Sequence, residues 1–396
     1  MLQYISASLS LLSRTVKNYT TIEQFKAGKY EKGFQYRYFV PNTINNEWRW
    51  NDGTLNELLE KASIKLGELN SYAKLVPNID LFIHLHITKE AVVSSRIEGT
   101  QTTMNEALLP EQDINPEKRH DWLEVQNYTK AMNEAIGAMA TLPLSSRLLR
   151  RTHEILMEGV RGRDKMPGEF RTSQNWIGGA SLADAAFIPP SHDYVNELMS
   201  DLEKFLHNSD IHVPLLIRIG IAHYQFETIH PFLDGNGRIG RLMITLYLVS
   251  EKILEKPLLY LSFFLERNRS LYYDHLTSVR EKNDLLGWLR FFLVGVEQTA
   301  TKAVETLSNV LKLKTDLEDQ INREFGKGSV SALRLLNELF RRPAVTRRDV
   351  ERICNLSTKA ASNLVNSFHS RNYLREVTGR QRDQIFLFEP YVRLFD

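Results

Sequence analysis

The residues best suited to chemistry lie together in residues 223–241, which read HYQFETIHPFLDGNGRIGR. Within this segment the turn Gly235-Asn236-Gly237 opens an apolar stretch with helical spacing. Backbone N–H groups at a helix N-terminus can bind an anion, and glycines let a phosphate approach the backbone closely. Arg238 and Arg241 are three residues apart, so they share one face of this helix and suit bidentate contacts to phosphate. The segment favours a polyphosphate ligand.

Two more residues of the same segment have catalytic potential. Asp234 directly precedes the glycine turn, where a carboxylate beside phosphates can hold Mg²⁺. His230 lies four residues earlier, and an imidazole with an ordinary pKa of about 6.5 can act as a general base at neutral pH. A Gly-x-Gly turn alone is more often a helix cap, and a lone histidine is more often a packed side chain. Their combination within twelve residues favours a catalytic site.

A metal site on the preceding helix is a weaker interpretation. His223 and Glu227 are four residues apart, and His230 follows three residues later. The His-Glu-x-x-His spacing of zinc hydrolases is absent, so metal-dependent hydrolysis through these residues has the wrong spacing. We expect His223 and Glu227 to brace the loop by hydrogen bonds.

The elements that position these residues are mainly helical. Apolar residues recur at helical spacing through most of the chain, for example over residues 54–69 and 78–98. The exception is residues 173–190, where short extended pieces at 175–177 and 186–188 are joined by small residues, as in a mobile hairpin. A charged helix from about residue 298 to 325 is typical of a spacer or a dimerisation stem.

The end of the chain has the pattern of a winged helix-turn-helix. After Gly326-Lys327-Gly328, helices are expected through residues 330–339, from Thr346 and from Ser357, followed by a polar turn at 379–383 between two apolar pieces. Residues 328–396 carry 12 Lys and Arg against 7 Asp and Glu, a net charge of +5. Glu351, Glu376 and Asp383 interrupt this charge, so both DNA binding and protein docking stay open.

Composition excludes several other classes. The chain has 396 residues, of which 42% are hydrophobic, with a formal net charge of +2 and one cysteine, Cys354. It therefore has no internal disulfide framework, and the sequence favours the cytoplasm. No uncharged apolar run approaches the roughly 18 residues of a membrane helix. Residues 1–13 lack a basic leading region, so we interpret them as a partly apolar helix rather than a signal peptide.

The string HPFLDGNGRIGR, residues 230–241, resembles the signature of the Fic family, His-x-Phe-x-Asp/Glu-Gly-Asn-Gly-Arg-x-x-Arg, at all eight of its specified positions. The resemblance extends over about residues 39–294. Residues 168–171 (Gly-Glu-Phe-Arg) and the hairpin after them are similar to the family's flap. Residues 268–273, which begin with Asn268, are similar to a downstream segment of the nucleotide pocket.

The resemblance implies a mainly α Fic-type helical domain with a β-hairpin flap, and transfer of AMP from ATP to a Ser, Thr or Tyr hydroxyl of a target protein. It implies that His230 is the general base and that Asp234 holds Mg²⁺. A relative that transfers phosphate instead has a bulkier residue at the second glycine, so Gly237 favours AMP transfer. The implied ATP-binding residues are Gly235, Asn236, Gly237, Arg238, Ile239, Gly240, Arg241 and Asn268.

A second motif points to built-in inhibition. Residues 94–99 (Ser-Ser-Arg-Ile-Glu-Gly) are similar to the inhibitory motif Ser/Thr-x-x-x-Glu-Gly/Asn of many Fic proteins. Ser94 and Glu98 are four apart and share a helix face. The resemblance implies that Glu98 pairs with Arg241 and displaces the γ-phosphate, in the class with an N-terminal inhibitory helix. A carboxylate near a helix C-terminus is disfavoured by the helix dipole, which favours a functional role for Glu98.

These patterns predict four regions. They are an N-terminal helical region with the inhibitory helix (1–121), a Fic catalytic domain (122–297), a linker helix (298–327) and a winged-helix domain (328–396). The expected partners are ATP and a protein substrate docked on the hairpin by strand addition. Self-modification, a homodimer and DNA binding stay open. So do two alternative functions, a nucleotide-sensing DNA-binding regulator and removal of AMP from a modified target in the same pocket.

Overall fold

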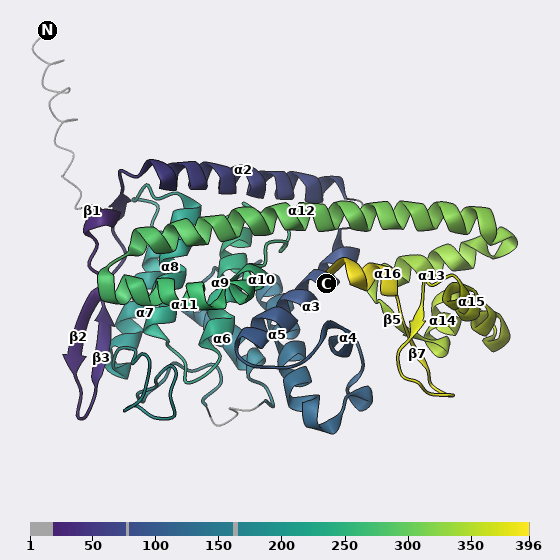
Figure 1. The fold of residues 1–396 in the computed structure, drawn as a ribbon, viewed down its shortest axis with the longest axis horizontal. Helices are drawn as coiled ribbons and strands as arrows, with labels where there is room; N and C mark the ends of the chain where they lie inside the picture. The colour runs from purple at the N-terminus through teal and green to yellow at the C-terminus, as the bar shows by residue number, and fades with distance from the viewer. Residues whose placement is uncertain (1–18, 77–78, 161–164, 396) are drawn as a thin grey trace, which may run out of the picture. The chain divides into compact units, whose positions relative to one another are not determined.

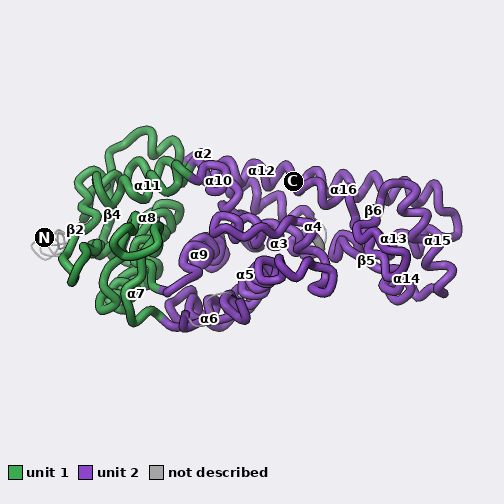
Figure 2. Tube along the Cα trace, turned by 60° about the horizontal axis from the view of Figure 1, so that its bottom comes forward, with its two compact units in different colours: residues 1–59, 170–231, 270–293 green, residues 60–169, 232–269, 294–396 purple. Residues whose placement is uncertain are grey.

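The computed structural model describes residues 19–76, 79–160 and 165–395 and is mainly helical. The helix predicted for residues 1–13 lies outside the described residues. The chain forms two compact units, each built from separate stretches of sequence (Figure 2). The first unit comprises residues 1–59, 170–231 and 270–293, and the second comprises 60–169, 232–269 and 294–396. The four predicted regions stay a prediction.

Two small sheets belong to the first unit. Strand β1 (Tyr19–Thr21) pairs in parallel with β4 (Glu47–Arg49), and β2 (Gly28–Lys32) pairs antiparallel with β3 (Arg37–Pro41). The indole of Trp48 in β4 is buried and donates a hydrogen bond to the carbonyl of Ile44 at 3.0 Å. The partner of β4, β1, lies nearly 30 residues earlier in the chain.

The helices of the first unit enclose one almost fully buried helix, α8. They are α7 (His192–His207), α8 (Leu215–Ile229), α11 (Arg269–Lys282) and the first turns of α12 (Leu285–Glu324). Gly220 lets α8 approach α12, because a Cβ at this position would meet Leu289 Cδ2 at 2.9 Å. The Trp288 indole donates to the Gly220 carbonyl at 2.8 Å. This packing fixes α8, whose C-terminal end carries His230.

The second unit is built around α9 (Asn236–Ser250), which packs against α3, α5 and α6 (Figure 1). Nearly every residue of α9 is buried, as its long apolar run predicts. The predicted helix over 78–98 is α3. The surrounding helices are α3 (Asp80–Ile97), α4 (Met104–Ala107), α5 (Arg119–Ala138), α6 (Ser146–Leu156) and α10 (Ser262–Arg267), and α2 (Gly53–Leu75) begins in the first unit.

The C-terminal elements follow α12, a single helix of 40 residues. They are α13 (Ser329–Arg341), β5 (Ala344–Thr346), α14 (Arg347–Cys354), α15 (Thr358–Ser370), β6 (Arg375–Glu376), β7 (Ile385–Leu387) and α16 (Glu389–Val392). The strands form an antiparallel sheet in the order β5-β7-β6. Thr346 and Ser357 cap α14 and α15, so both helices begin where the sequence predicts. The winged-helix assignment stays a prediction.

Short 3-10 helices complete the described secondary structure: η1 (Ile22–Gln24), η2 (Glu111–Asp113), η3 (Pro116–Lys118), η4 (Gly326–Gly328) and η5 (Arg393–Phe395). No helix in the described ranges combines the length and the apolar character that crossing a bilayer requires.

Aromatic side chains join the C-terminal elements to α3 within the second unit. The Phe340 ring on α13 meets Phe82 of α3 edge to face, with ring centroids 5.6 Å apart. It also contacts Phe388 at 5.1 Å and Tyr391 at 4.9 Å. Phe340 is fully buried, so this cluster is a hydrophobic core shared by α3 and the last 70 or so residues.

We expect Phe340→Ala to lower the free energy of unfolding of the second unit by about 3–5 kcal/mol, because it leaves a cavity among three aromatic rings. Thermal unfolding followed by circular dichroism measures the loss. Val330→Ala on the same helix is the control, since Val330 is 67% exposed and its loss should change stability by less than about 0.5 kcal/mol. Equal midpoints for the two variants would contradict the shared core.

Candidate active site

The glycine turn at the start of α9 has the backbone that an anion site requires. Gly235 precedes the helix with φ of 74°, in the left-handed region that favours glycine, and a Cβ there would meet Met157 Sδ at 3.1 Å. The side chain of Asn236 closes the turn. Its Oδ1 accepts from the N–H of Phe232 and its Nδ2 donates to the carbonyl of Phe232, both at 2.8 Å. The turn is therefore held in one conformation by the chain itself.

His153 on α6 supports the same turn, and sequence analysis missed it. Its Nδ1 accepts from the N–H of Gly168 at 2.9 Å, so Nε2 carries the proton and donates to the carbonyl of Asp234 at 3.0 Å. Its ring stacks on Phe232 with centroids 3.9 Å apart. Burial lowers the pKa of His153 to about 4, so the ring stays neutral. No motif spacing in the sequence marks a histidine 81 residues from its partner.

Arg238 is a buried cation with a carboxylate partner from another helix. It is 3% exposed, and its Nη1 donates to Glu124 Oε2 on α5 at 3.0 Å. Its Nη2 lies 3.8 Å from Met157 Sδ and 3.8 Å from Asp234 Oδ1. Glu124 therefore compensates the burial of this guanidinium beside the glycine turn. The sequence signature includes Arg238 but not Glu124.

Arg241 is buried one turn further along α9 and is held by α3. Its Nε donates to the Ser94 hydroxyl at 3.0 Å, and its Nη2 donates to the Ser94 carbonyl at 2.9 Å and to Glu98 Oε1 at 2.6 Å. Arg241 is 3% exposed. The same Glu98 oxygen would clash with a Cβ built on Gly237. The Glu98 carboxylate thus lies against the first turn of α9, at the end where an anion is favoured.

Glu90 continues the row of polar residues on this face of α3. It is 3% exposed, and its Oε1 accepts hydrogen bonds from the hydroxyls of Tyr128 and Ser262. Burial raises the pKa of Glu90 to about 7, although these hydrogen bonds and the charge of Arg241 oppose the rise. Glu90, Ser94 and Glu98 are spaced at four-residue intervals, so one helix face presents three polar groups toward α9.

His230 lies in the first unit, at the C-terminal end of α8. It adopts the left-handed conformation with φ of 50°, and its N–H donates to the Phe226 carbonyl at 2.9 Å. Its own carbonyl accepts from Arg171 Nε at 2.9 Å and from Asn175 Nδ2 at 3.3 Å. A non-glycine residue in this conformation persists where its surroundings enforce it.

Arg171 provides most of that enforcement. It is 2% exposed, and its guanidinium also donates to the carbonyls of Ser173, Pro190 and Ile229. Its backbone N–H donates to the Pro231 carbonyl at 2.9 Å. Burial lowers the pKa of Arg171 to about 10. The sequence includes Arg171 only as part of the flap-like segment, and its role as the support of the His230 turn is visible only in the fold.

The predicted hairpin contains one ladder pair. Ile177 and Phe187 exchange both backbone hydrogen bonds, at 2.8 and 3.1 Å. Gly178 and Gly179 follow with positive φ, and Asp184 accepts from the N–H of Ala180 at 2.9 Å to close the tip. The extended pieces at 175–177 and 186–188 thus lie beside each other. The role of this hairpin as a flap stays a prediction.

The remaining predicted site residues are distributed as follows. Ile239 and Gly240 are buried in the first turns of α9, and the Asp234 side chain is about half exposed. Asn268 ends α10, where its amide donates to the Phe264 carbonyl at 2.9 Å. The Nε2 of His223 is hydrogen-bonded to the Tyr272 hydroxyl at 2.9 Å, and the bracing of the loop by His223 and Glu227 stays a prediction.

No cluster of three or more metal-ligating side chains occurs in the described ranges. The structure brings Ser94, Glu98, Gly237 and Arg241 into direct contact within the second unit.

Two family descriptions match the chain. Residues 56–137 match "Fic/DOC family N-terminal" and residues 143–248 match "Fic/DOC family". The first range includes Ser94 and Glu98, and the second includes the glycine turn and both arginines. The chain carries a Fic/DOC-family domain and the N-terminal region that accompanies it. This Fic chain is 33% identical over 129 residues to protein adenylyltransferase fic-1 of Caenorhabditis elegans and 32% identical over 135 residues to protein adenylyltransferase Fic of Drosophila melanogaster.

The matched segment covers 30–33% of this Fic chain and 24% of those two relatives. The chain thus spans about a quarter of the length of the curated relatives it matches. Solved structures are similar over more of it. A Fic family protein from Desulfovibrio desulfuricans aligns over 85% of this chain and 96% of its own, with 22% identity and a TM-score of 0.55. A Fic domain containing signaling protein from Bacteroides thetaiotaomicron aligns over 65% and 97%, with 17% identity and a TM-score of 0.50.

The Glu90 carboxyl predicts a pH dependence of stability. Its pKa is about 7 in the folded chain against 4.5 ordinarily, so the stability that the protonated form contributes is complete below about pH 4.5 and is lost as the pH rises through 7. Glu90→Gln cannot ionise. We expect its thermal stability relative to the unsubstituted chain to increase by about 2 kcal/mol between pH 5 and pH 8, in thermal melts at matched salt. Glu134→Gln, at an exposed site, is the control, and its stability should change with pH as that of the parent chain does. The same pH dependence for Glu90→Gln and the parent chain would contradict the prediction.

Proposed function

We propose that this Fic chain is a protein adenylyltransferase, transferring AMP from ATP to a hydroxyl group of a target protein, and that Glu98 restrains it. The supporting observation is the contact of Arg241 with Ser94 and Glu98 at the first turn of α9. This position combines a helix N-terminus with two buried arginines, and a carboxylate lies against it. The names of the curated relatives support the same activity.

In the proposed reaction the target hydroxyl oxygen attacks the α-phosphorus of ATP. A bond forms between that oxygen and phosphorus, the bond from phosphorus to the bridging oxygen breaks, and pyrophosphate leaves. His230 takes the hydroxyl proton as general base. Backbone N–H groups of residues 235–240 and the Arg238 guanidinium bind the phosphate oxygens. Such preorganised donors contribute strongly to catalysis, because they are already oriented before charge develops.

Asp234 suits Mg²⁺ bound together with a nucleotide. Its side chain is about half exposed and stands directly before the glycine turn. Mg²⁺ commonly takes one or two carboxylates and completes its shell with phosphate oxygens and water, so one carboxylate fits this role. When bound, the ion would offset the negative charge of the phosphates. Asn268 would contact the nucleotide, as the resemblance implies.

The proposed restraint is a competition for Arg241. A γ-phosphate needs the guanidinium that Glu98 and Ser94 engage, and a carboxylate next to the site repels phosphate. Gly237 supports AMP transfer over phosphate transfer, because the relative that transfers phosphate has a bulkier residue at this position. In this chain a Cβ at residue 237 would also clash with Glu98. The hairpin around Ile177 and Phe187 would add a strand of the target protein.

For the C-terminal elements we propose a docking role rather than DNA reading. Arg380, on the predicted wing, forms an ion pair with Asp113 of the second unit and is therefore engaged within the chain. The winged-helix prediction gives further base-reading candidates, which are Lys359, Ser362, Asn363, Asn366 and Arg382. Of these, Asn366 accepts a hydrogen bond from Arg347 at 2.9 Å. Removal of AMP in the same pocket is the alternative to transfer, and incorporation assays separate the two.

We expect Glu98→Gly to raise incorporation of labelled AMP from ATP about tenfold or more, into the enzyme itself or into proteins of a cell lysate, because it releases Arg241. His230→Ala in the Glu98→Gly background should lower incorporation by about a hundredfold or more. Intact-mass spectrometry detects the added AMP.

Glu117→Gly is the matched control for the first change, since Glu117 is exposed on the 3-10 helix η3 and has no part in the site. It should incorporate AMP at the parent rate. Equal incorporation by Glu98→Gly and His230→Ala would refute both assigned roles, and loss of AMP from a modified target without any incorporation would favour the removal reaction.

Arg171→Lys tests the support of the His230 turn. Lysine cannot reach the four carbonyls that the guanidinium engages, so we expect the rate of AMP incorporation to fall about tenfold or more in the Glu98→Gly background. The KM for ATP should change by less than about threefold, because the described hydrogen bonds of Arg171 go to residues 173–231 and not to the glycine turn. Arg37→Lys, at an exposed site in β3, is the control. A change in KM alone would contradict a positioning role.

A further inference from the structure

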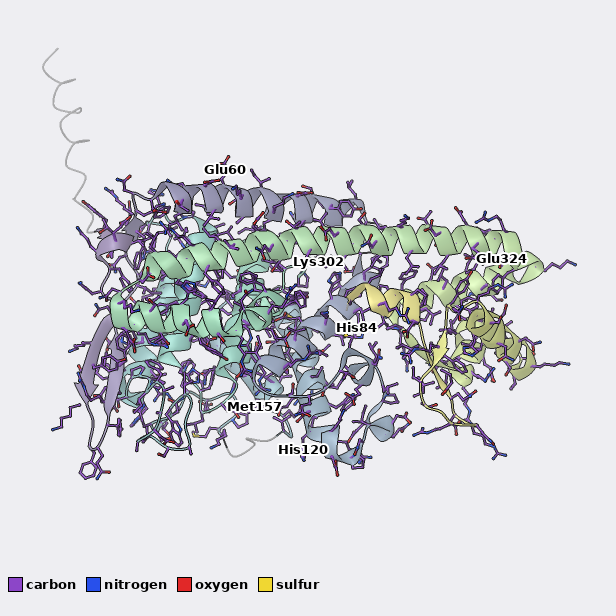
Figure 3. All side chains as sticks on the ribbon, in the orientation of Figure 1. Glu60, His84, His120, Met157, Lys302 and Glu324 are labelled. Atoms are coloured by element: carbon purple, nitrogen blue, oxygen red, sulfur yellow. The ribbon has the colours of Figure 1, made fainter. Side chains whose placement is uncertain are left out.

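A cavity of about 620 Å³ lies within the second unit beside α3. Its walls come from α3, α10, α12 and residues 394–395 near the end of the chain. In Figure 3 the labelled Lys302 projects from α12, and the labelled His84 marks the part of α3 that precedes the cavity residue His86. None of the residues 234–241 is among the cavity's described lining residues, although Asn268 is. The cavity is therefore a feature apart from the glycine turn.

The charged side chains around this cavity have one sign. Lys89, Arg267 and Lys302 line it, and no aspartate or glutamate does so among the described residues. Lys89 donates to the Phe395 carbonyl, so its ammonium group is held at the wall. Lys302 Nζ also lies 3.7 Å from Glu305 Oε2, which is outside the described lining. The lining itself therefore carries an excess of positive charge, which attracts an anion.

Two buried polar atoms of the cavity lining have no hydrogen-bond partner in the described part of the chain. They are Nε2 of His86 and the hydroxyl of Tyr260, on residues that are 7% and 8% exposed. Burial lowers the pKa of His86 to about 4 and raises the pKa of Tyr260, so both groups are neutral. A buried polar group without a partner costs free energy, and a ligand with hydrogen-bonding oxygens would supply the partner.

The rest of the lining favours a ring. Phe263 is 36% exposed and lies beneath two cations, with Lys89 Nζ 5.1 Å and Arg267 Cζ 5.6 Å from its ring centroid. Phe395 meets the His86 ring edge to face at 4.7 Å. Aromatic walls offer a ligand ring the stacked or edge-on contacts that rings prefer. An inorganic anion would use the cations but leave these walls in contact with water.

We propose that this cavity is a binding site for a small aromatic anion, a ring that carries one carboxylate or one phosphate. The anionic group is bound by Arg267 and Lys302 at the open side. The ring lies against Phe263 and Phe395, and a polar substituent reaches Tyr260. The volume of the cavity accommodates a substituted single ring, and drug-sized ligands occupy pockets of similar size.

Isothermal titration calorimetry of the whole chain with 4-hydroxybenzoate, phenyl phosphate and phenol tests the proposal. We expect at least one of the two anions to bind saturably with a stoichiometry of one. The anion that binds more tightly shows whether the site prefers a carboxylate or a phosphate. Phenol should bind about tenfold more weakly, because it lacks the charge. No nucleotide is present, so the result is independent of the proposed AMP transfer. Absence of saturable binding of both anions at millimolar concentration would overturn the site.

Variants locate the binding. The double variant Lys302→Ala, Arg267→Ala should lower the affinity for the tighter-binding anion about tenfold or more. Tyr260→Phe should lower the affinity for 4-hydroxybenzoate about threefold. Lys312→Ala is the matched control, since Lys312 is an exposed lysine of α12 outside the cavity lining and should leave the affinity unchanged. Lys302 and Arg267 are exposed, so the fold should tolerate their loss, and thermal melts verify this.

Two outcomes would overturn the assignment even if an anion binds. Equal weakening by Lys312→Ala and by the double variant would mean non-specific attraction to a basic surface. Displacement of the bound anion by ATP in a stoichiometric competition titration would mean that the cavity belongs to the nucleotide site, through Asn268. We expect ATP to leave the anion bound.

Discussion

The arrangement of the second unit depends on the burial of Arg241. A guanidinium that is 3% exposed cannot lose its charge, so the fold must surround it with acceptors. Ser94 supplies a hydroxyl and a carbonyl, and Glu98 supplies a carboxylate. These acceptors belong to α3, so the contact joins the inhibitory motif to the helix that carries the glycine turn. A phosphate in place of Glu98 would satisfy the same cation, which is the physical basis of the proposed competition.

Helix α3 is therefore a structural connection as well as a carrier of the motif. One face presents Glu90, Ser94 and Glu98 toward the buried arginine, while Phe82 packs against Phe340 of α13. Between these contacts lie the cavity residues His86 and Lys89. The C-terminal elements and the cavity thus share one helix of 18 residues, and Glu98 directly follows that helix.

The two halves of the signature are stabilised in the same way, each inside its own unit. In the second unit, His153 and Asn236 hold the loop before α9 through backbone groups of Phe232 and Asp234. In the first unit, Arg171 holds the His230 turn through backbone carbonyls. Buried polar side chains that donate hydrogen bonds to loop carbonyls make irregular backbone rigid. Catalysis requires such rigidity, because the reacting groups must be preorganised.

The sequence by itself determined the local features of this Fic protein. The twelve-residue signature, the helix starts at Thr346 and Ser357 and the paired extended pieces of the hairpin follow from spacing and capping over a few residues. Such features depend on bonds within one or two turns, so the sequence exposes them directly. The resemblance also pointed to the pairing of Glu98 with Arg241, which spacing alone does not give.

Only the tertiary structure decided which distant residues support the site. Glu124 beside Arg238, His153 beside Asp234 and Arg171 beside His230 are separated by 59 to 114 residues in sequence. The parallel pairing of β1 with β4 and the cavity beside α3 likewise arise from distant segments. A buried polar side chain finds its partner through the packing of whole helices, and one sequence carries no spacing rule for such contacts. The signature was therefore readable from the sequence, and the residues that support it were readable only from the fold.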